Sequence, residues 1–299
     1  MAIAGFEERR IDTGEVTLSV HRAGAGAPVI LLHGYPQTHM TWAPVAPRLA
    51  EAFDVIVPDL RGYGASDAPA DDEGHTVYSK RSMARDIVGL MDALGLDRAH
   101  VIGHDRGARV AYRLALDAPE RVDRLGICEV VPTGDFWAAW DAELARSAYH
   151  WTFLAQPAPL PERLIGGAPD FYCDWTLAGW TAAGDLSPFA PEALESYRAQ
   201  MRDPARVAAM CADYRAGATT DRRIDAETRA MGHRIAAPLH FLHAEAGFPA
   251  RTGDAAGLWA PWAARLTVST CRTGHFVMEE DPAAFLSAFV PFLRGDASD

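Results

Sequence analysis

An aspartate stands in a sequence context that suits nucleophilic attack. Residues 103–107 read Gly-His-Asp-Arg-Gly, after a short apolar run and before a helical pattern that starts at Ala108. A strand, a sharp turn and a helix in this order form a nucleophile elbow, which exposes the central side chain. A carboxylate there suits displacement at a saturated carbon, because the resulting alkyl ester can be hydrolysed afterwards. The sequence predicts Asp105 as a nucleophile; the alternative is that it only caps the helix.

A base and an acid complete the expected set. His275 follows the last expected strand, and a loop there can bring its imidazole to the elbow to activate water. An acidic partner would hold the tautomer of that imidazole. Glu129, at the end of the strand after the elbow helix, is the first candidate, and Glu245, after the strand at 238–243, is the alternative. The backbone N–H groups of Tyr35 and Arg106 are expected to form an oxyanion hole.

Two arginines at the start of the elbow helix predict an anionic substrate. Arg106 and Arg109 are three residues apart and so share a face of that helix. A guanidinium can hold a carboxylate through two hydrogen bonds. Such a pair would offset the repulsion between a substrate carboxylate and Asp105, which is roughly 3 kcal/mol at about 5 Å and an effective dielectric of 20. The alternative is a pair of surface ion-pairing residues, since arginine is abundant and Lys80 is the only lysine.

Composition excludes several other classes of protein. A chain of 299 residues with 49% hydrophobic and 23% charged residues is a folded globular protein, with room for two modest domains or one large domain with an insertion. A net charge of −12 argues against a nucleic acid or an anionic membrane as the main partner. The four widely spaced cysteines indicate buried thiols in a reducing compartment. We find no secretory signal and no membrane-spanning apolar run, so we expect a cytoplasmic protein.

The sequence carries none of the common spacings of a metal or cofactor site. The sequence has no C-x-x-C pair, no H-E-x-x-H motif and no complete dinucleotide or phosphate-binding loop. We therefore expect no metal and no cofactor. The glycines at 24–26 are interpreted as a hairpin turn.

The elements that position these residues alternate between strands and helices. Expected strands lie at 16–22, 28–32, 55–58, 99–103, 122–130, 238–243 and 266–270, and expected helices include 42–50, 82–94 and 281–293. This alternation predicts an α/β fold with a mostly parallel sheet and helices on both faces. Residues 133–234 show helical spacing and no convincing strand, which predicts a helical cap inserted into a core formed by 1–132 and 235–299.

The motifs together resemble a known family. Residues 33–38 (HGYPQT), 59–64 (DLRGYG), 103–107 and 274–276 (GHF) are similar to α/β-hydrolases with an aspartate nucleophile, which include epoxide hydrolases and dehalogenases. Arg106 with Arg109, the run 149–151 (YHW), Trp180 and residues 213–218 (DYRAGA) narrow the resemblance to haloacetate (fluoroacetate) dehalogenases, over nearly the whole chain.

The resemblance implies a role for each matching residue. Asp105 would be the nucleophile and His275 the base, and Arg106 and Arg109 would bind the substrate carboxylate. The pocket would be closed in part by Trp180. The departing halide would be bound by His150, Trp151 and Tyr214. Their N–H and O–H groups suit the compact charge of fluoride; the alternative is that these aromatic residues only pack in the cap.

Two positions depart from the family pattern. The family commonly has Asp where Glu129 stands and Gly where Ala108 stands. Glu at the first position occurs among related haloalkane dehalogenases, which suggests an intact triad with a longer acid.

The expected function is hydrolytic dehalogenation of a small 2-haloacid, such as fluoroacetate or chloroacetate to glycolate, through an ester on Asp105. The partners would be the haloacid and water, and similar enzymes are often homodimers. One alternative is an epoxide hydrolase, in which Tyr149 and Tyr214 would protonate the epoxide oxygen. A second is a non-catalytic receptor on the same fold.

Overall fold

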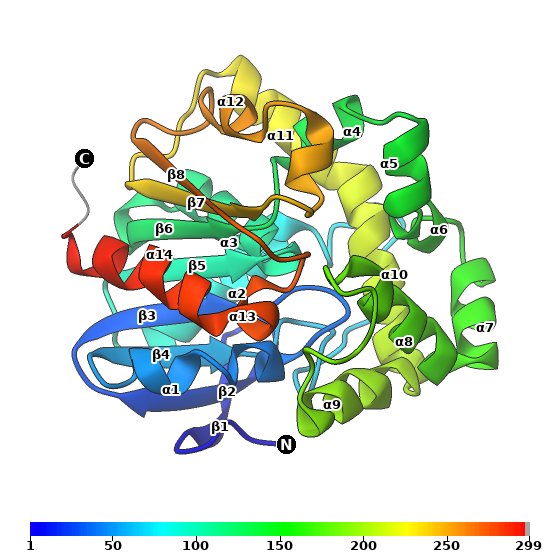
Figure 1. Ribbon diagram of the computed structural model, residues 1–299, viewed down its shortest axis with the longest axis horizontal. Helices are drawn as coiled ribbons and strands as arrows, with labels where there is room; N and C mark the ends of the chain where they lie inside the picture. The colour runs from blue at the N-terminus through cyan, green and yellow to red at the C-terminus, as the bar shows by residue number, and fades with distance from the viewer. Residues whose placement is uncertain (297–299) are drawn as a thin grey trace.

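A twisted sheet of eight strands forms the centre of the computed structural model, which describes residues 1–296 (Figure 1). The strands are β1 (Glu7–Asp12), β2 (Thr17–Gly24), β3 (Ala27–Leu32), β4 (Phe53–Pro58), β5 (Ala99–His104), β6 (Val122–Cys128), β7 (Leu239–Ala244) and β8 (Leu266–Cys271). Their order is β1-β2-β4-β3-β5-β6-β7-β8, and only the β1–β2 and β2–β4 pairs are antiparallel. The predicted mostly parallel α/β sheet is confirmed.

Two details of the sheet differ from the prediction. The first strand, β1, was not predicted, because its sequence EERRID is charged and mostly exposed at the edge of the sheet. The prediction of a hairpin turn at 24–26 is wrong, since β4 lies between β2 and β3 and pairs with both. Gly24 turns the chain there with φ +90°, and a Cβ would lie 2.1 Å from the carbonyl oxygen of Phe53.

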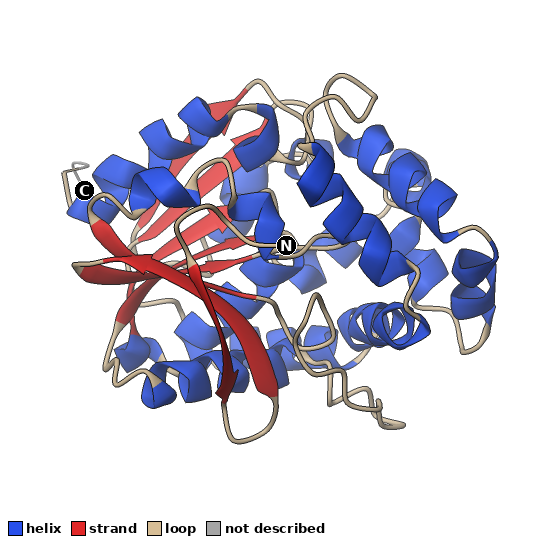
Figure 2. Cartoon of the chain, turned by 90° about the horizontal axis from the view of Figure 1, so that it is seen from below, coloured by secondary structure: helices blue, strands red, loops and turns tan. Residues whose placement is uncertain are grey.

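Helices cover both faces of the sheet. In Figure 1, α1 and α14 lie in front of it and α2 and α3 behind it, and Figure 2 shows helices on both sides from below. The core helices are α1 (Ala46–Leu49), α2 (Lys80–Ala93), α3 (Arg106–Asp117), α12 (Ala255–Trp259), α13 (Val277–Glu280) and α14 (Pro282–Arg294). The helix predicted at 42–50 is instead a 3-10 turn, His39–Trp42, followed by the short α1, because Pro44 and Pro47 interrupt the backbone donors.

Between β6 and β7 the chain forms a series of helices joined by loops. We call residues 133–234 the cap segment; the structure describes all of them and places none in a strand. Most of the segment lies on the right in Figure 1, beyond the ends of the central strands, and its last helix lies at the top. Its helices are α4 (Thr133–Ala138), α5 (Ala142–Ser147), α6 (His150–Leu154), α7 (Leu160–Gly167), α8 (Pro169–Trp180), α9 (Pro191–Met201), α10 (Pro204–Ala218) and α11 (Thr220–Ala230).

The core sits on both sides of the central strands. Strands β4 and β5 are buried at every residue, as expected for parallel strands covered on both faces. The four cysteines are buried and free of disulfides. In the described part of the chain, no helix combines the length and the apolar character needed to cross a membrane.

Candidate active site

The turn between β5 and α3 holds Asp105 in a strained conformation. Its φ is +47° and its ψ −119°, and its side chain makes no capping hydrogen bond to α3. Positive φ is unfavourable for a residue with a Cβ. A Cβ on Gly107 would lie 2.2 Å from the carbonyl oxygen of Leu32, so only glycine allows this close approach. The elbow geometry is therefore present, and Asp105 does not act as a simple helix cap.

The carboxylate of Asp105 is buried between an N–H donor and an imidazole. The backbone N–H of Tyr35 donates to Oδ1 at 2.8 Å, and Nε2 of His275 lies 3.7 Å from Oδ2. Within residues 1–296, no hydrogen bond joins the backbone N–H of Arg106 to this carboxylate. Burial raises the pKa of Asp105, but the neighbouring His275 and Arg106 lower it by more, so that the net pKa lies well below its ordinary value. Asp105 is therefore ionised.

Glu129 holds the other side of His275. Its Oε2 lies 3.2 Å from Nδ1 of His275, and its Oε1 accepts the backbone N–H of Ala244. The φ of Glu129 is +62°, which turns the chain directly after β6. Burial lowers the pKa of His275, but Asp105 and Glu129 outweigh it and raise the pKa to about 9. His275 is thus an imidazolium held between two carboxylates.

Glu245, the alternative acid, lies elsewhere. Its side chain is 61% exposed and faces Arg272, 4.0 Å away. The chain near it is nevertheless important for Glu129, because a Cβ on Gly247 would lie 2.0 Å from Oε2 of Glu129. The structure brings together His275 and Glu129, with no room for a side chain at residue 247.

Both predicted arginines are buried beside the elbow, so neither is a surface residue. Arg106 is paired with Asp213 of α10, and of its guanidinium nitrogens Nη1 has no partner among the described residues. Arg109 donates to the carbonyl of Val131 and the hydroxyl of Thr133, both at 3.0 Å. No carboxylate lies within 4 Å of Arg109 in the described chain. Burial lowers the pKa of Arg109, which marks an uncompensated buried charge next to Asp105.

Aromatic side chains of the cap segment face the arginines. Tyr214 of α10 stands 4.4 Å from the Arg106 guanidinium, and Trp151 of α6 stands 4.6 Å from that of Arg109. The Tyr214 hydroxyl and Nδ1 of His150 are buried without a hydrogen-bond partner among residues 1–296. Burial raises the pKa of Tyr214 and lowers that of His150, so both are neutral. The rings of His150, Trp151 and Tyr214 lie within 6.5 Å of one another.

A cavity of about 560 Å³ lies beside Trp180 and His275. Its lining includes His275, Trp180, Phe248, Arg146 and Arg251. A smaller pocket continues inward to Asp105, Arg109 and Trp151, and both cavities share His275 and Phe248. The Trp180 ring is 4.3 Å from that of His150 and 5.7 Å from that of His275. Trp180 therefore lies where the outer cavity narrows toward the nucleophile.

Three residues near the site were given no role from the sequence. Asp213 binds Arg106, Lys80 binds Asp213, and Phe248 lines both cavities. Asp213 stood beside Tyr214 in a recognised motif, and Lys80 was noted as the only lysine, but neither signal indicates which residue it contacts. Phe248 carried no signal of its own.

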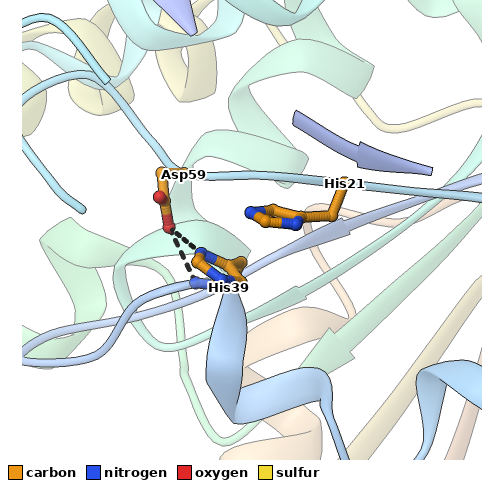
Figure 3. A group of neighbouring side chains, drawn as sticks. All are labelled: His21, His39 and Asp59. Atoms are coloured by element: carbon orange, nitrogen blue, oxygen red, sulfur yellow. Dashed lines mark hydrogen bonds and ion pairs between the residues drawn. The ribbon is translucent and has the colours of Figure 1, made fainter. Parts of the chain in front are cut away.

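A separate cluster of His21, His39 and Asp59 places three potential metal-ligand atoms within 4.8 Å of one another (Figure 3). Nδ1 of His39 is 2.9 Å from Asp59 and Nε2 is 3.0 Å from the carbonyl of Met1; both partners are acceptors, so both ring nitrogens are protonated. The His21 ring is stacked on His39 at 3.7 Å and 22°. Lone pairs of nearly parallel rings do not converge on one ion, so we assign no metal to this cluster.

Comparison with known proteins agrees with this architecture. Residues 27–229 match the family described as alpha/beta hydrolase fold, and the chain belongs to that family. It is similar to a fluoroacetate dehalogenase from Burkholderia sp., with 41% identity over 97% of this chain and 95% of the relative. A soluble epoxide hydrolase from Corynebacterium sp. (strain C12) is 32% identical over 91% of each chain. The solved structure of an alpha/beta hydrolase from Nostoc sp. PCC 7120 superposes with a TM-score of 0.94 at 43% identity, over 97% of this chain and 99% of that one.

Proposed function

We propose that this protein hydrolyses the carbon–halogen bond of a small 2-haloacid, such as fluoroacetate or chloroacetate, to give glycolate. The observation that carries the proposal is the buried Arg109, which has no carboxylate partner among the described residues although it lies beside the ionised Asp105. A buried guanidinium of this kind is stabilised when it binds a carboxylate. The similarity to a fluoroacetate dehalogenase supports the same substrate class.

In the first step, Oδ2 of Asp105 attacks the carbon that bears the halogen, on the side opposite the halide. Oδ1 is held by the N–H of Tyr35, which leaves Oδ2 as the reacting oxygen. A C–O ester bond forms, the C–X bond breaks and the halide leaves with its electron pair. Arg106, through Nη1, and Arg109 hold the substrate carboxylate.

The departing halide needs donors in place of the water it leaves behind. We assign this task to His150, Trp151 and Tyr214, whose rings lie within 6.5 Å of one another beside the arginines. The unpartnered Tyr214 hydroxyl and His150 Nδ1 support this assignment. By analogy with oxyanion-hole donors, each such donor contributes roughly 3 kcal/mol to the transition state. Trp180 would narrow the pocket and exclude water during this step.

In the second step, water attacks the ester carbonyl carbon of Asp105 and gives a proton to Nε2 of His275. Tyr35, with Arg106 as the predicted second donor, stabilises the oxyanion, and the product leaves as a 2-hydroxy acid after taking up the proton. Esterification removes the charge of Asp105, one of the two charges that raise the pKa of His275. The imidazolium then releases its Nε2 proton to the solvent, so His275 becomes a base only after the ester has formed, while Glu129 keeps its orientation.

The covalent step is tested with a His275→Asn variant incubated with fluoroacetate. We expect mass spectrometry to find an ester on the peptide that contains Asp105, because attack can occur but hydrolysis lacks its base. An unmodified peptide, alongside a wild type that releases fluoride, would refute the covalent route.

An epoxide hydrolase is the second candidate, and the unpartnered hydroxyl of Tyr214 is the observation that favours it. A related epoxide hydrolase shows that this fold supports that chemistry. The partner tyrosine, Tyr149, lines the outer cavity and not the inner pocket. Halide release from chloroacetate without diol formation from styrene oxide supports the dehalogenase, and the reverse result supports the epoxide hydrolase. A receptor without catalysis would show no turnover of either compound, and Asp105→Asn would leave its ligand affinity unchanged.

We also propose that the protein is a cytoplasmic homodimer. Buried free cysteines fit a reducing compartment. Leu164 of α7 and Phe171 of α8 are 59% and 67% exposed, as is typical of a surface that a partner covers. Light scattering is expected to give twice the chain mass, and Phe171→Glu to reduce it to one chain. Met231→Glu, at another exposed apolar residue, is the control; a monomeric wild type would reject the homodimer.

A further inference from the structure

Lys80 is buried at the start of α2 and reaches the substrate site through one intermediary. Its Nζ donates to Asp213, and the same carboxylate accepts hydrogen bonds from Arg106. We propose that Lys80 is a positioning residue for substrate binding, which prevents Asp213 from neutralising Arg106 so that the three groups present a net positive charge to the substrate carboxylate. This inference rests on the proposed function, in which the substrate is an anion.

Asp213 fixes the orientation of Arg106. Nε of Arg106 lies 3.2 Å from Oδ2 of Asp213, and Nη2 donates to both Oδ1 and the backbone carbonyl of Asp213. The hydroxyl of Tyr63 donates to Oδ2 at 2.8 Å. Gly217 makes room for this approach, because a Cβ there would lie 2.9 Å from Nη2. Only Nη1 of the guanidinium is then left for the substrate.

That orientation has an electrostatic cost, which Lys80 offsets. Arg106 and Asp213 alone sum to zero charge, and all three groups are buried, where charges are weakly screened. With Lys80 the sum is one positive charge. Asp221 accepts the backbone N–H of Lys80, and burial raises the pKa of Asp221 above its ordinary value. Burial and Arg106 lower the pKa of Lys80 to about 8, which leaves it mostly protonated at neutral pH.

The test replaces Lys80 with methionine, which keeps most of the stem and removes the charge. For bromoacetate, we expect KM to rise about tenfold, equivalent to about 1.4 kcal/mol of binding free energy, with kcat within about twofold of wild type. Calorimetry should show a similar weakening of glycolate binding, a readout that does not depend on turnover. Arg113→Met, which removes another buried cation of α3 that pairs with Asp117, should leave KM unchanged.

A double variant separates charge from packing. Lys80→Met with Asp213→Asn removes one charge of each sign and retains an acceptor oxygen for Arg106, so KM should return to within about threefold of wild type. A KM unchanged in Lys80→Met, or higher in the double variant than in the single one, would overturn the inference. A wild type that neither releases halide nor binds glycolate would instead overturn the proposed function, and the two failures are therefore distinguishable.

Discussion

At the scale of single residues, the proposed mechanism depends on one imidazole that lies between two carboxyl groups. His275 contacts Glu129 at 3.2 Å and faces Asp105 at 3.7 Å, and only the second of these groups changes its charge during the reaction. The same imidazole can therefore be charged while the nucleophile attacks and neutral when water must be activated.

This predicts a dependence of the His275 pKa on Asp105. In the wild type, NMR titration of the histidines should show His275 deprotonating near pH 9. In Asp105→Asn, one of the two groups that raise this pKa loses its charge while burial still lowers it, so the pKa should fall by at least about one unit. A pKa that stays near 9 in the variant would show that Asp105 does not control the proton on His275.

Sequence motifs predicted Asp105 and His275 as site residues, because the signal for each lies in residues that are adjacent in the chain. The choice between Glu129 and Glu245 needed the structure, since both follow strands and only the path of each loop decides which one meets the imidazole. The partner of Arg106 could not be predicted either, because Asp213 is 107 residues away and meets it only through the packing of α10 on the elbow.

At the scale of elements, the loop after β7 fits tightly against Glu129. Gly247→Ala would place a Cβ 2.0 Å from its carboxylate and displace it. We expect kcat for bromoacetate to fall roughly 100-fold, because a displacement of about 1 Å in a catalytic group can cost this much. Thermal unfolding of the same variant would be measured together with its kcat.

Gly166→Ala, on α7, is the matched control for this substitution. Nothing lies within 4 Å of a Cβ there, so the activity and stability of this variant should equal those of the wild type. An equal loss of activity in both variants would contradict the role of Gly247.

The contact between the cap segment and the core is predicted to depend on pH. Glu279 of α13 is buried and accepts from Tyr197 of α9, at 2.9 Å, as well as from Gln37 and Thr41. Burial outweighs these donors and raises the pKa of Glu279 to about 8. The folded state then holds a proton that the unfolded state releases above its ordinary pKa, so this contribution to stability is present at low pH and lost as pH rises toward 8.

Glu279→Gln removes this titration. Between pH 5 and pH 8.5, the free energy of unfolding of the wild type should fall by about 4 kcal/mol relative to that of Glu279→Gln. Urea denaturation at both pH values measures the difference, and parallel stability curves would contradict the assignment.

Elements whose own sequence carries a strong hydrophobic pattern were predictable. Elements whose position depends on pairing with neighbouring strands were not. Strand β5 is buried at every residue and has an apolar centre, Val101 and Ile102, and it was found directly. The β1 strand has no such pattern because it lies at the edge, and the position of β4 between β2 and β3 depends on pairing that no local sequence signal carries.

At the scale of the whole molecule, the charge around the outer cavity has the opposite sign to the net charge of the chain. The chain carries −12, yet the outer cavity is lined by Arg146 and Arg251 and, among the described residues, by no carboxylate. Such a local field attracts an anion toward an otherwise acidic protein.

Removing both arginines should slow substrate capture. We expect Arg146→Gln with Arg251→Gln to reduce kcat/KM for bromoacetate about fivefold at low ionic strength, and the difference to shrink at high salt. Arg163→Gln with Arg294→Gln makes the same change of net charge at exposed positions outside the cavity lining. Equal effects of the two double variants would show that only total charge matters.

Lys80 has a further use because it is the only side-chain amine. The cap segment covers it through Asp213 of α10 and Asp221 of α11, whereas Met1 is exposed. An acylating reagent should therefore label the amino terminus quickly and Lys80 only when α10 and α11 separate from α2. The rate at which Lys80 is acylated would then measure how often α10 and α11 separate from α2. No probe would have to be introduced into the protein.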